Sequence, residues 1–225
     1  MRVKKFFLFI VVALIGFVIT NSENEVSAVE NPVNKISGEV SDSSLLTYSL
    51  LYSQAIPINL QQRFVEDGGK IIITPIIAVN TSGQKAGGVI AGQCQISDTP
   101  TIYVNSTIVD NAKSYKEGTA KKVIVHEFGH YVHAKANLIK YGKYSYNLPK
   151  SFANAYAAEK GIIATEMSET LKDSFKNTNS LKEYYANIFA GIYTEPSVMV
   201  EYYPLSTKIV LDDINLVAAQ QPLQY

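Results

Sequence analysis

The chain has 225 residues, of which 20 are basic and 20 acidic, so its formal net charge is zero, and it has one cysteine. A balanced charge without a basic block gives no sign of binding to nucleic acid or to an anionic membrane surface. One cysteine excludes an intramolecular disulfide, so the fold must rely on packing or on a bound metal. A chain of this length can bury a substantial core as one domain.

The first 28 residues have the features of a secretory signal peptide. A basic stretch at residues 2–5 precedes an apolar run at 6–19, and a small-residue cleavage site follows at 26–28. The apolar run has 14 residues, fewer than the roughly 20 that a membrane span needs. We therefore expect cleavage after Ala28, a secreted extracellular protein and no membrane attachment afterwards. An uncleaved signal anchor is the alternative.

Residues 29–44 predict a flexible leader between the signal peptide and the domain. The segment is polar and contains a proline and a glycine, both of which interrupt regular structure. The domain then extends over residues 45–225, a length that one folded unit can have. We expect it to act as a monomer.

The domain is predicted to run from helices to strands and back to helices. Two short helices are followed by a β-branched strand, a hairpin, a long helix, a Tyr-rich loop and further helices. These segments are 45–51, 57–65, 70–74 with an extension at 76–79, a loop at 80–88, the hairpin 89–96 and 101–104, then 119–139, 139–149, 151–159, a partly helical 166–180, 181–193 and 205–217. The order predicts an α+β fold, in which a small mixed sheet packs on mostly helical structure.

The long helix at 119–139 carries the motif HEFGH at residues 126–130, which has the pattern H-E-x-x-H. Residues four apart lie on one face of a helix, so the imidazoles of His126 and His130 can bind one metal ion. Glu127 is offset around the helix, where its carboxylate can reach a water beside the metal without being a ligand. This combination is typical of zinc proteases, with Glu127 as the general base.

Two observations favour a metal site over a buried helix whose histidines are ordinary core residues. All three histidines of the chain, His126, His130 and His133, lie within eight positions. Gly129 costs about 1 kcal/mol relative to alanine inside a helix, which is explicable if another element packs closely against it. His133 lies about 10 Å from His126 along the helix axis, too far to share a zinc with both ligands, and is expected at the surface or as a support for the ligands.

A catalytic zinc takes three protein ligands and a water. The downstream carboxylates that can supply the third ligand are Glu159, Glu166, Glu169 and Glu183. Glu183 begins an apolar helix, where a buried carboxylate needs a partner such as a metal. Ser180 and Glu183 also match the capping-box pattern S-x-x-E, in which the glutamate only closes the helix end. From these residues alone, both roles of Glu183 are open.

The motif HEFGH, EYYANIFAGIY at 183–193 and EPSVMVEYYPLSTKIVLDDI at 195–214 together resemble the anthrax lethal factor-like zinc metalloprotease domain, which the secreted Pro-Pro endopeptidases share. The resemblance covers about residues 123–217. It implies a zincin-type catalytic domain, Zn²⁺ as the cofactor, Glu183 as the third ligand and a polypeptide substrate. The small size of the chain is similar to that of the Pro-Pro endopeptidases, which cut proline-rich surface proteins.

Two positions depart from the family pattern. Asn187 stands where the family has a second glutamate, on the same helix face as Glu183, where it can still support a ligand by hydrogen bonding. Lys176 stands seven residues before Glu183, where the family has a tyrosine that hydrogen-bonds the oxyanion. Either an insertion shifts the alignment, or another tyrosine (Tyr141, Tyr144 or Tyr146) replaces the donor, or the donor is missing. Loss of such a donor costs about 100- to 1,000-fold in rate, so the alternative to an endopeptidase is a weakly active or non-catalytic zinc-binding protein.

Overall fold

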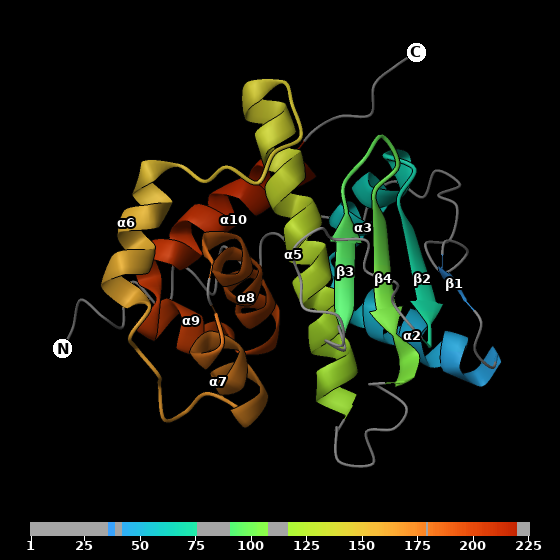
Figure 1. The fold of residues 1–225 in the computed structure, drawn as a ribbon, viewed down its shortest axis with the longest axis horizontal. Coiled ribbons are helices and arrows are strands. Elements are labelled where there is room, and N and C mark those ends of the chain that lie inside the picture. The colour runs from blue at the N-terminus through green and yellow to red at the C-terminus, as the bar shows by residue number, and fades with distance from the viewer. Residues whose placement is uncertain (1–35, 39–41, 76–90, 108–116, 179, 220–225) are drawn as a thin grey trace, which may run out of the picture.

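The computed structural model describes residues 36–38, 42–75, 91–107, 117–178 and 180–219 (Figure 1). The predicted signal peptide at 1–28, the strand extension at 76–79 and the loop at 80–88 lie outside these residues. Within the described ranges, no helix is both long enough and apolar enough to cross a membrane.

A mixed sheet with the strand order β1-β2-β4-β3 occupies one side of the molecule (Figure 1). The strands β1 (Ile36–Gly38), β2 (Lys70–Thr74) and β4 (Thr101–Asn105) are parallel to one another. The strand β3 (Gly92–Gln95) pairs antiparallel with β4, which confirms the predicted hairpin. Among the described strands, β3 has a neighbour on one side only, so its other edge is open to further pairing.

Two helices, α2 (Asp42–Ala55) and α3 (Ile58–Glu66), lie behind the sheet in Figure 1. Both were predicted, and Pro57 separates them because it cannot donate a backbone hydrogen bond. The expectation of a flexible leader at 29–44 is wrong at two places. Residues 36–38 form β1, which pairs with β2, and α2 already begins at Asp42.

The long helix α5 (Glu117–Tyr141) runs between the sheet and the remaining helices (Figure 1). It begins two residues before the predicted helix and ends two residues after it. Ile124, Phe128 and Val132 are completely buried and follow one apolar stripe, as predicted. One side of α5 contacts β3, and another packs against α8 (Leu181–Thr194).

The C-terminal half is helical, which confirms an α+β fold with a small mixed sheet. Besides α8 it contains α6 (Lys150–Glu159), α7 (Glu169–Lys176), α9 (Pro196–Tyr202) and α10 (Pro204–Ala218). The first residue of α9 and of α10 is a proline, whose fixed φ suits that position. The predicted helices correspond to α6, α8 and α10, and α7 lies in the partly helical segment, whereas α9 was not predicted.

The helix α8 packs against α5 at Gly129. A Cβ atom at Gly129 would lie 3.0 Å from Cβ of Phe189 and 3.2 Å from Cα of Ala186. These distances are shorter than ordinary van der Waals contact, so a side chain would separate the two helices. The expectation that another element packs closely against this glycine is therefore confirmed.

We predict that Gly129→Ala lowers the free energy of unfolding by about 1 kcal/mol. Overpacking costs about 1–3 kcal/mol, because Ala186 Cα and Phe189 Cβ cannot rotate away, and it outweighs the roughly 1 kcal/mol gain in helix propensity. Urea unfolding in the presence of a chelator measures the change without a contribution from metal binding. The control is Gly161→Ala, where a Cβ meets nothing within 4 Å and the effect should stay within about 0.5 kcal/mol. A Gly129→Ala protein as stable as the control would contradict the prediction.

Candidate metal centre

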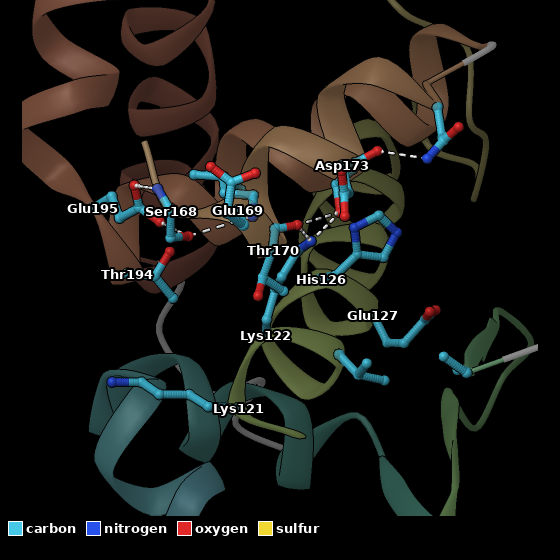
Figure 2. A pocket seen from close by; sticks show the side chains of 16 residues that line it. Lys121, Lys122, His126, Glu127, Ser168, Glu169, Thr170, Asp173, Thr194 and Glu195 are labelled. Carbon is cyan, nitrogen blue, oxygen red and sulfur yellow. Dashed lines mark hydrogen bonds between the residues drawn. The ribbon is translucent and has the colours of Figure 1, made fainter. Parts of the chain in front are cut away.

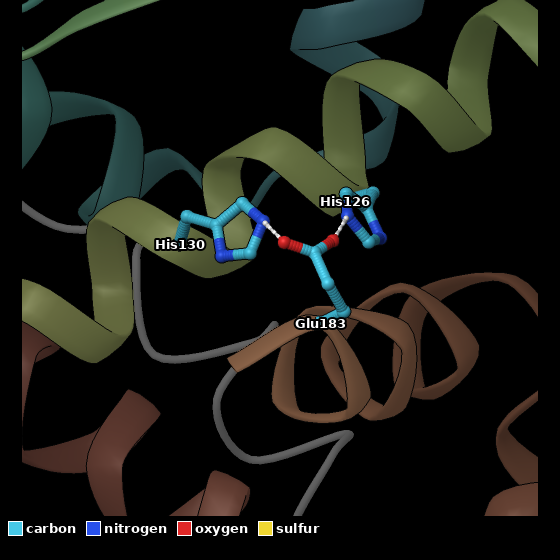
Figure 3. A group of neighbouring side chains, drawn as sticks. All are labelled: His126, His130 and Glu183. Carbon is cyan, nitrogen blue, oxygen red and sulfur yellow. Dashed lines mark hydrogen bonds and ion pairs between the residues drawn. The ribbon is translucent and has the colours of Figure 1, made fainter. Parts of the chain in front are cut away.

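The structure brings the side chains of His126, His130 and Glu183 together (Figure 3). Nε2 of His126 lies 3.1 Å from Oε2 of Glu183, and Nε2 of His130 lies 3.5 Å from Oε1. One ligand atom from each of the three residues lies within 4.8 Å of the other two. Ligands about 2.1 Å from a tetrahedral zinc lie about 3.4 Å apart, so the spacing matches a set of atoms that can share one ion.

The donor types also suit a transition metal. Two imidazole nitrogens and one carboxylate oxygen form the His₂Glu set of many catalytic zinc sites, which leaves a fourth position for water or substrate. Two histidines and one carboxylate also hold iron in non-haem oxygenases. The three residues therefore define a candidate site for a transition metal.

The backbone of Glu183 is fixed by the start of α8. Ser180 is the N-cap of this helix, and its hydroxyl oxygen accepts the N–H of Glu183 at 3.2 Å. The Glu183 side chain turns toward the two imidazoles, and these hydrogen bonds lower the pKa of its carboxyl against the opposing effect of burial. Half of the capping-box interpretation is thus correct, because the serine caps the helix while the glutamate side chain joins the histidines.

The other three candidate glutamates have different partners. Glu159 is buried and accepts hydrogen bonds from the backbone N–H groups of Leu205 and Ser206 at the start of α10. Its negative charge there stabilises the positive end of the helix dipole. The remaining pairs are Glu166 with Thr165 and Tyr202, and Glu169 with Lys172. The structure does not bring these carboxylates to the histidines.

Asn187 orients the first histidine. Its amide nitrogen donates to the carbonyl of Ser174 and to the hydroxyl of Thr178, so its Oδ1 is left to accept from Nδ1–H of His126 at 2.9 Å. In the neutral imidazole this assignment leaves Nε2 of His126 unprotonated, as a metal ligand requires, whereas in the protonated ring Nε2–H donates to Glu183. An orienting acceptor of this kind fixes the ring and the tautomer of a metal-binding histidine.

Burial affects the two histidines to different extents. Burial lowers the pKa of His130 to about 4, despite a hydrogen bond to Glu183. It also disfavours the charged form of His126, but Glu183 and Glu127 together raise the pKa of that residue. Both imidazoles contact the carboxylate of Glu183 directly. A cation bound between the three side chains would replace these direct contacts.

Glu127 lies against the edge strand rather than against the ligands. A Cβ on Gly92 would lie 2.7 Å from both Cγ and Oε1 of Glu127, so glycine leaves the space that the carboxylate occupies. The backbone N–H of Cys94 hydrogen-bonds the carboxylate. Burial raises the pKa of Glu127 to about 7, and a cation at the neighbouring ligands would draw it back down.

The open edge of β3 presents main-chain groups to the site. The N–H of Asn105 donates to the carbonyl of Ala91, so every second residue from Ala91 onward bonds to β4. Gly92 and Cys94 therefore direct their N–H and C=O groups away from β4. The Cys94 carbonyl is already contacted, at 3.5 Å, by the hydroxyl of Tyr146.

Among the three candidate tyrosines, Tyr146 is the one that the structure places at the site. Its ring centroid lies 6.0 Å from that of His130, and the ammonium of Lys182 lies 4.3 Å from the centre of its ring. Tyr141 is exposed at the end of α5, and Tyr144 lies near Asp67 and Asp98. Lys176, where the lethal factor-like domain has a tyrosine, lines a separate cavity with Tyr156 and Lys160.

His133 supports the loop that carries Tyr146. The expectation of a surface position is wrong, because His133 is 1% exposed and stacks on Tyr185 with ring centroids 4.5 Å apart. Its Nε2 lies 3.4 Å from the carbonyl oxygen of Asn147, which also accepts a hydrogen bond from Asn137. His133 does not join the three candidate ligands, in agreement with the distance argument.

A cavity of about 1120 Å³ opens beside His126 and Glu127 and extends to α7 (Figure 2). Lys122 and Val123, on the turn of α5 before His126, form part of its wall. Sequence reasoning missed Lys122, Gly92 and the contact with Cys94. Lys122 could have been noticed from the HEFGH motif, because it lies one helical turn before His126. No local sequence feature indicates that Gly92 and Cys94 contact Glu127.

No protein-family model matches the chain, and no curated protein matches it. The class that the geometry defines is therefore a protein with a candidate transition-metal centre of two histidines and one glutamate. Beside that centre stands a second, separately held glutamate, Glu127.

We predict that Asn187→Ala weakens zinc binding by about 10- to 100-fold, because His126 loses the acceptor that fixes its ring. Competition against a chromophoric chelator measures the affinity. The matched control is Asn177→Ala, since that exposed asparagine bonds only the carbonyl of Asp173 among the described residues. Equal affinities for the two variants would refute an orienting role for Asn187.

Proposed function

We propose that the chain is a secreted zinc-dependent endopeptidase with a zincin-type catalytic domain. The observation that carries the proposal is the convergence of the two HEFGH imidazoles on Glu183, while Glu127 is held apart against an edge strand. The resemblance to the lethal factor-like domain supports the same reaction. The predicted signal peptide supports secretion. We further propose that the protein acts on polypeptides as a monomer.

A bound zinc would supply a Lewis acid that acidifies a water and polarises the scissile carbonyl. His126, His130 and Glu183 would hold it. Glu127 then accepts the proton of the attacking water and passes it to the leaving amine. The N–H of Cys94 keeps the Glu127 carboxylate in position, and Gly92 leaves the room it needs.

The substrate binds as an added strand at the open edge of β3. Gly92 directs its N–H and C=O groups to that edge, where the backbone of an extended peptide can pair with them. Since β3 lies beside Glu127, pairing brings the peptide backbone to the reacting groups. By resemblance, the substrates are proline-rich surface or host proteins.

Tyr146 donates to the oxyanion that forms on the attacked carbonyl. Burial, with the nearby charges of Glu127 and Glu183, raises the pKa of its hydroxyl, so the hydroxyl keeps its proton. Its ring lies beside His130 and its hydroxyl beside the edge strand. Tyr146 thus takes the role that the family assigns to the position of Lys176.

We predict that Glu127→Gln binds one zinc ion per chain, as the unaltered protein does, but loses about 100- to 10,000-fold in cleavage rate. The substitution keeps the side-chain size and removes the base. Metal content is measured by mass spectrometry, and cleavage by digestion of a peptide library with and without a chelator. A zinc-loaded unaltered protein that cuts no peptide would refute the protease and favour the non-catalytic zinc-binding alternative, and iron in the site would refute the choice of metal.

We predict that Tyr146→Phe lowers kcat/KM by about 100- to 1,000-fold, because only the donating hydroxyl is removed. Zinc affinity should not change. Tyr144→Phe is the control from the same loop, and its rate should stay near that of the unaltered protein. If both variants cleave equally well, the oxyanion donor is not Tyr146.

A further inference from the structure

The cavity beside the metal centre contains a cation with uncharged partners. The ammonium of Lys122 donates to the carbonyl oxygen of Thr170 and to the hydroxyl of Ser174 (Figure 2). Among the described residues, no carboxylate forms an ion pair with Lys122. An ammonium has three N–H groups, and these two partners use two of them. Lys122 is half-buried and has no ion-pair partner among the described residues, which is unfavourable for its charge, and burial lowers its pKa to about 8.

The carboxylates around the cavity are engaged elsewhere. Asp173 and Glu195 are near enough to favour the charged form of Lys122, but they do not outweigh burial. Each acidic group of the rim has its own partner: Glu169 pairs with Lys172, Asp173 with Lys176, and Glu195 accepts the N–H and hydroxyl of Ser168. None of these three carboxylates forms an ion pair with Lys122, so its ammonium can interact with a group that enters the cavity.

The direction of β3 indicates which part of a peptide enters this cavity. Gly92 lies beside Val123, since a Cβ there would be 2.9 Å from Cγ1 of Val123, whereas Cys94 lies beside Tyr146. The strand therefore runs along α5 from the Val123 side toward the His130 side. A substrate paired antiparallel to β3 runs the opposite way, so its residues after the cleaved bond pass Val123 and reach Lys122.

We propose that Lys122 makes the enzyme selective for a carboxylate on the first or second residue after the cleaved bond. This inference rests on the proposed endopeptidase function. The carboxylate belongs either to an aspartate or glutamate side chain or to the C-terminus of the substrate. In both cases the remaining N–H of Lys122 donates to it, and the cation gains the counter-ion that the described part of the chain does not supply.

The first test uses matched peptides built on the best-cleaved library sequence. Each pair carries Glu or Gln at the first or second position after the cut, or ends there as a free acid or an amide. A hydrogen bond between charged groups is worth about 1.5–3 kcal/mol, so the unaltered enzyme should prefer the carboxylate by about 10- to 100-fold in kcat/KM. The Glu/Gln pairs report a side-chain carboxylate, and the acid/amide pairs report the terminus.

The variant Lys122→Gln should bring this ratio close to one, whatever its rate on the uncharged peptides. The control is Lys121→Gln, because Lys121 also lines the cavity but points away from Thr170 and His126 in Figure 2. The control should keep the preference. Equal kcat/KM values for the carboxylate and uncharged peptides in the unaltered enzyme would overturn the inference, and so would a preference for lysine or arginine. An equal loss of rate on all peptides in Lys122→Gln would also overturn it, because Lys122 would then only anchor α7.

A second measurement does not depend on turnover. In the zinc-loaded Glu127→Gln protein, NMR signals of the lysine side chains are followed while two hydroxamate-linked peptides are added, one with Glu and one with Gln after the hydroxamate. The hydroxamate anchors both at the metal, so the Lys122 signal should shift with the Glu peptide alone. An unmoved signal overturns the inference. A protein that binds zinc but cleaves nothing refutes the protease, and this titration then still decides whether Lys122 binds a carboxylate.

Discussion

The close approach of α8 to α5 at Gly129 is the constraint on which the candidate site depends. Because Gly129 has no side chain, Phe189 and Ala186 reach the surface of α5, and the first turn of α8 is carried alongside the HEFGH turn. That placement brings the carboxylate of Glu183, 57 residues away in the chain from His126, to within 3.1 Å of its Nε2. The glycine that weakens the isolated helix is therefore what allows the third donor to reach the first two.

The two glutamates at the site differ because different elements hold them. Glu183 lies between two imidazoles, which lower the pKa of its carboxyl and make it a donor for a cation. Glu127 lies on the other side, against Gly92 and the N–H of Cys94, where burial raises its pKa. Under the proposed function, one carboxylate binds the metal and the other moves protons, a separation of roles that a hydrolase needs.

A single hydrogen-bond network connects the ligand side to the cavity. It runs from His126 to Asn187, from the Asn187 amide to the carbonyl of Ser174, and from the Ser174 hydroxyl to the ammonium of Lys122. The same helix, α7, therefore helps to orient a candidate ligand and forms a wall of the cavity. Under our proposals, binding of a substrate carboxylate to Lys122 acts on the helix that also holds His126 in place.

The sequence by itself determined what depends on local spacing. The four-residue separation of His126 and His130 places both on one helix face, and apolar periodicity predicted α5, β2, the hairpin and most later helices. Contacts between distant segments were decided by the tertiary structure alone. It brings Glu183 rather than Glu159 to the two histidines, and Tyr146 rather than Tyr144 beside His130. It also buries His133 and pairs β1 with β2. Residue type and periodicity describe one element at a time, whereas each of these outcomes depends on which other element packs against it, and a carboxylate or a tyrosine carries no local mark of its eventual neighbour.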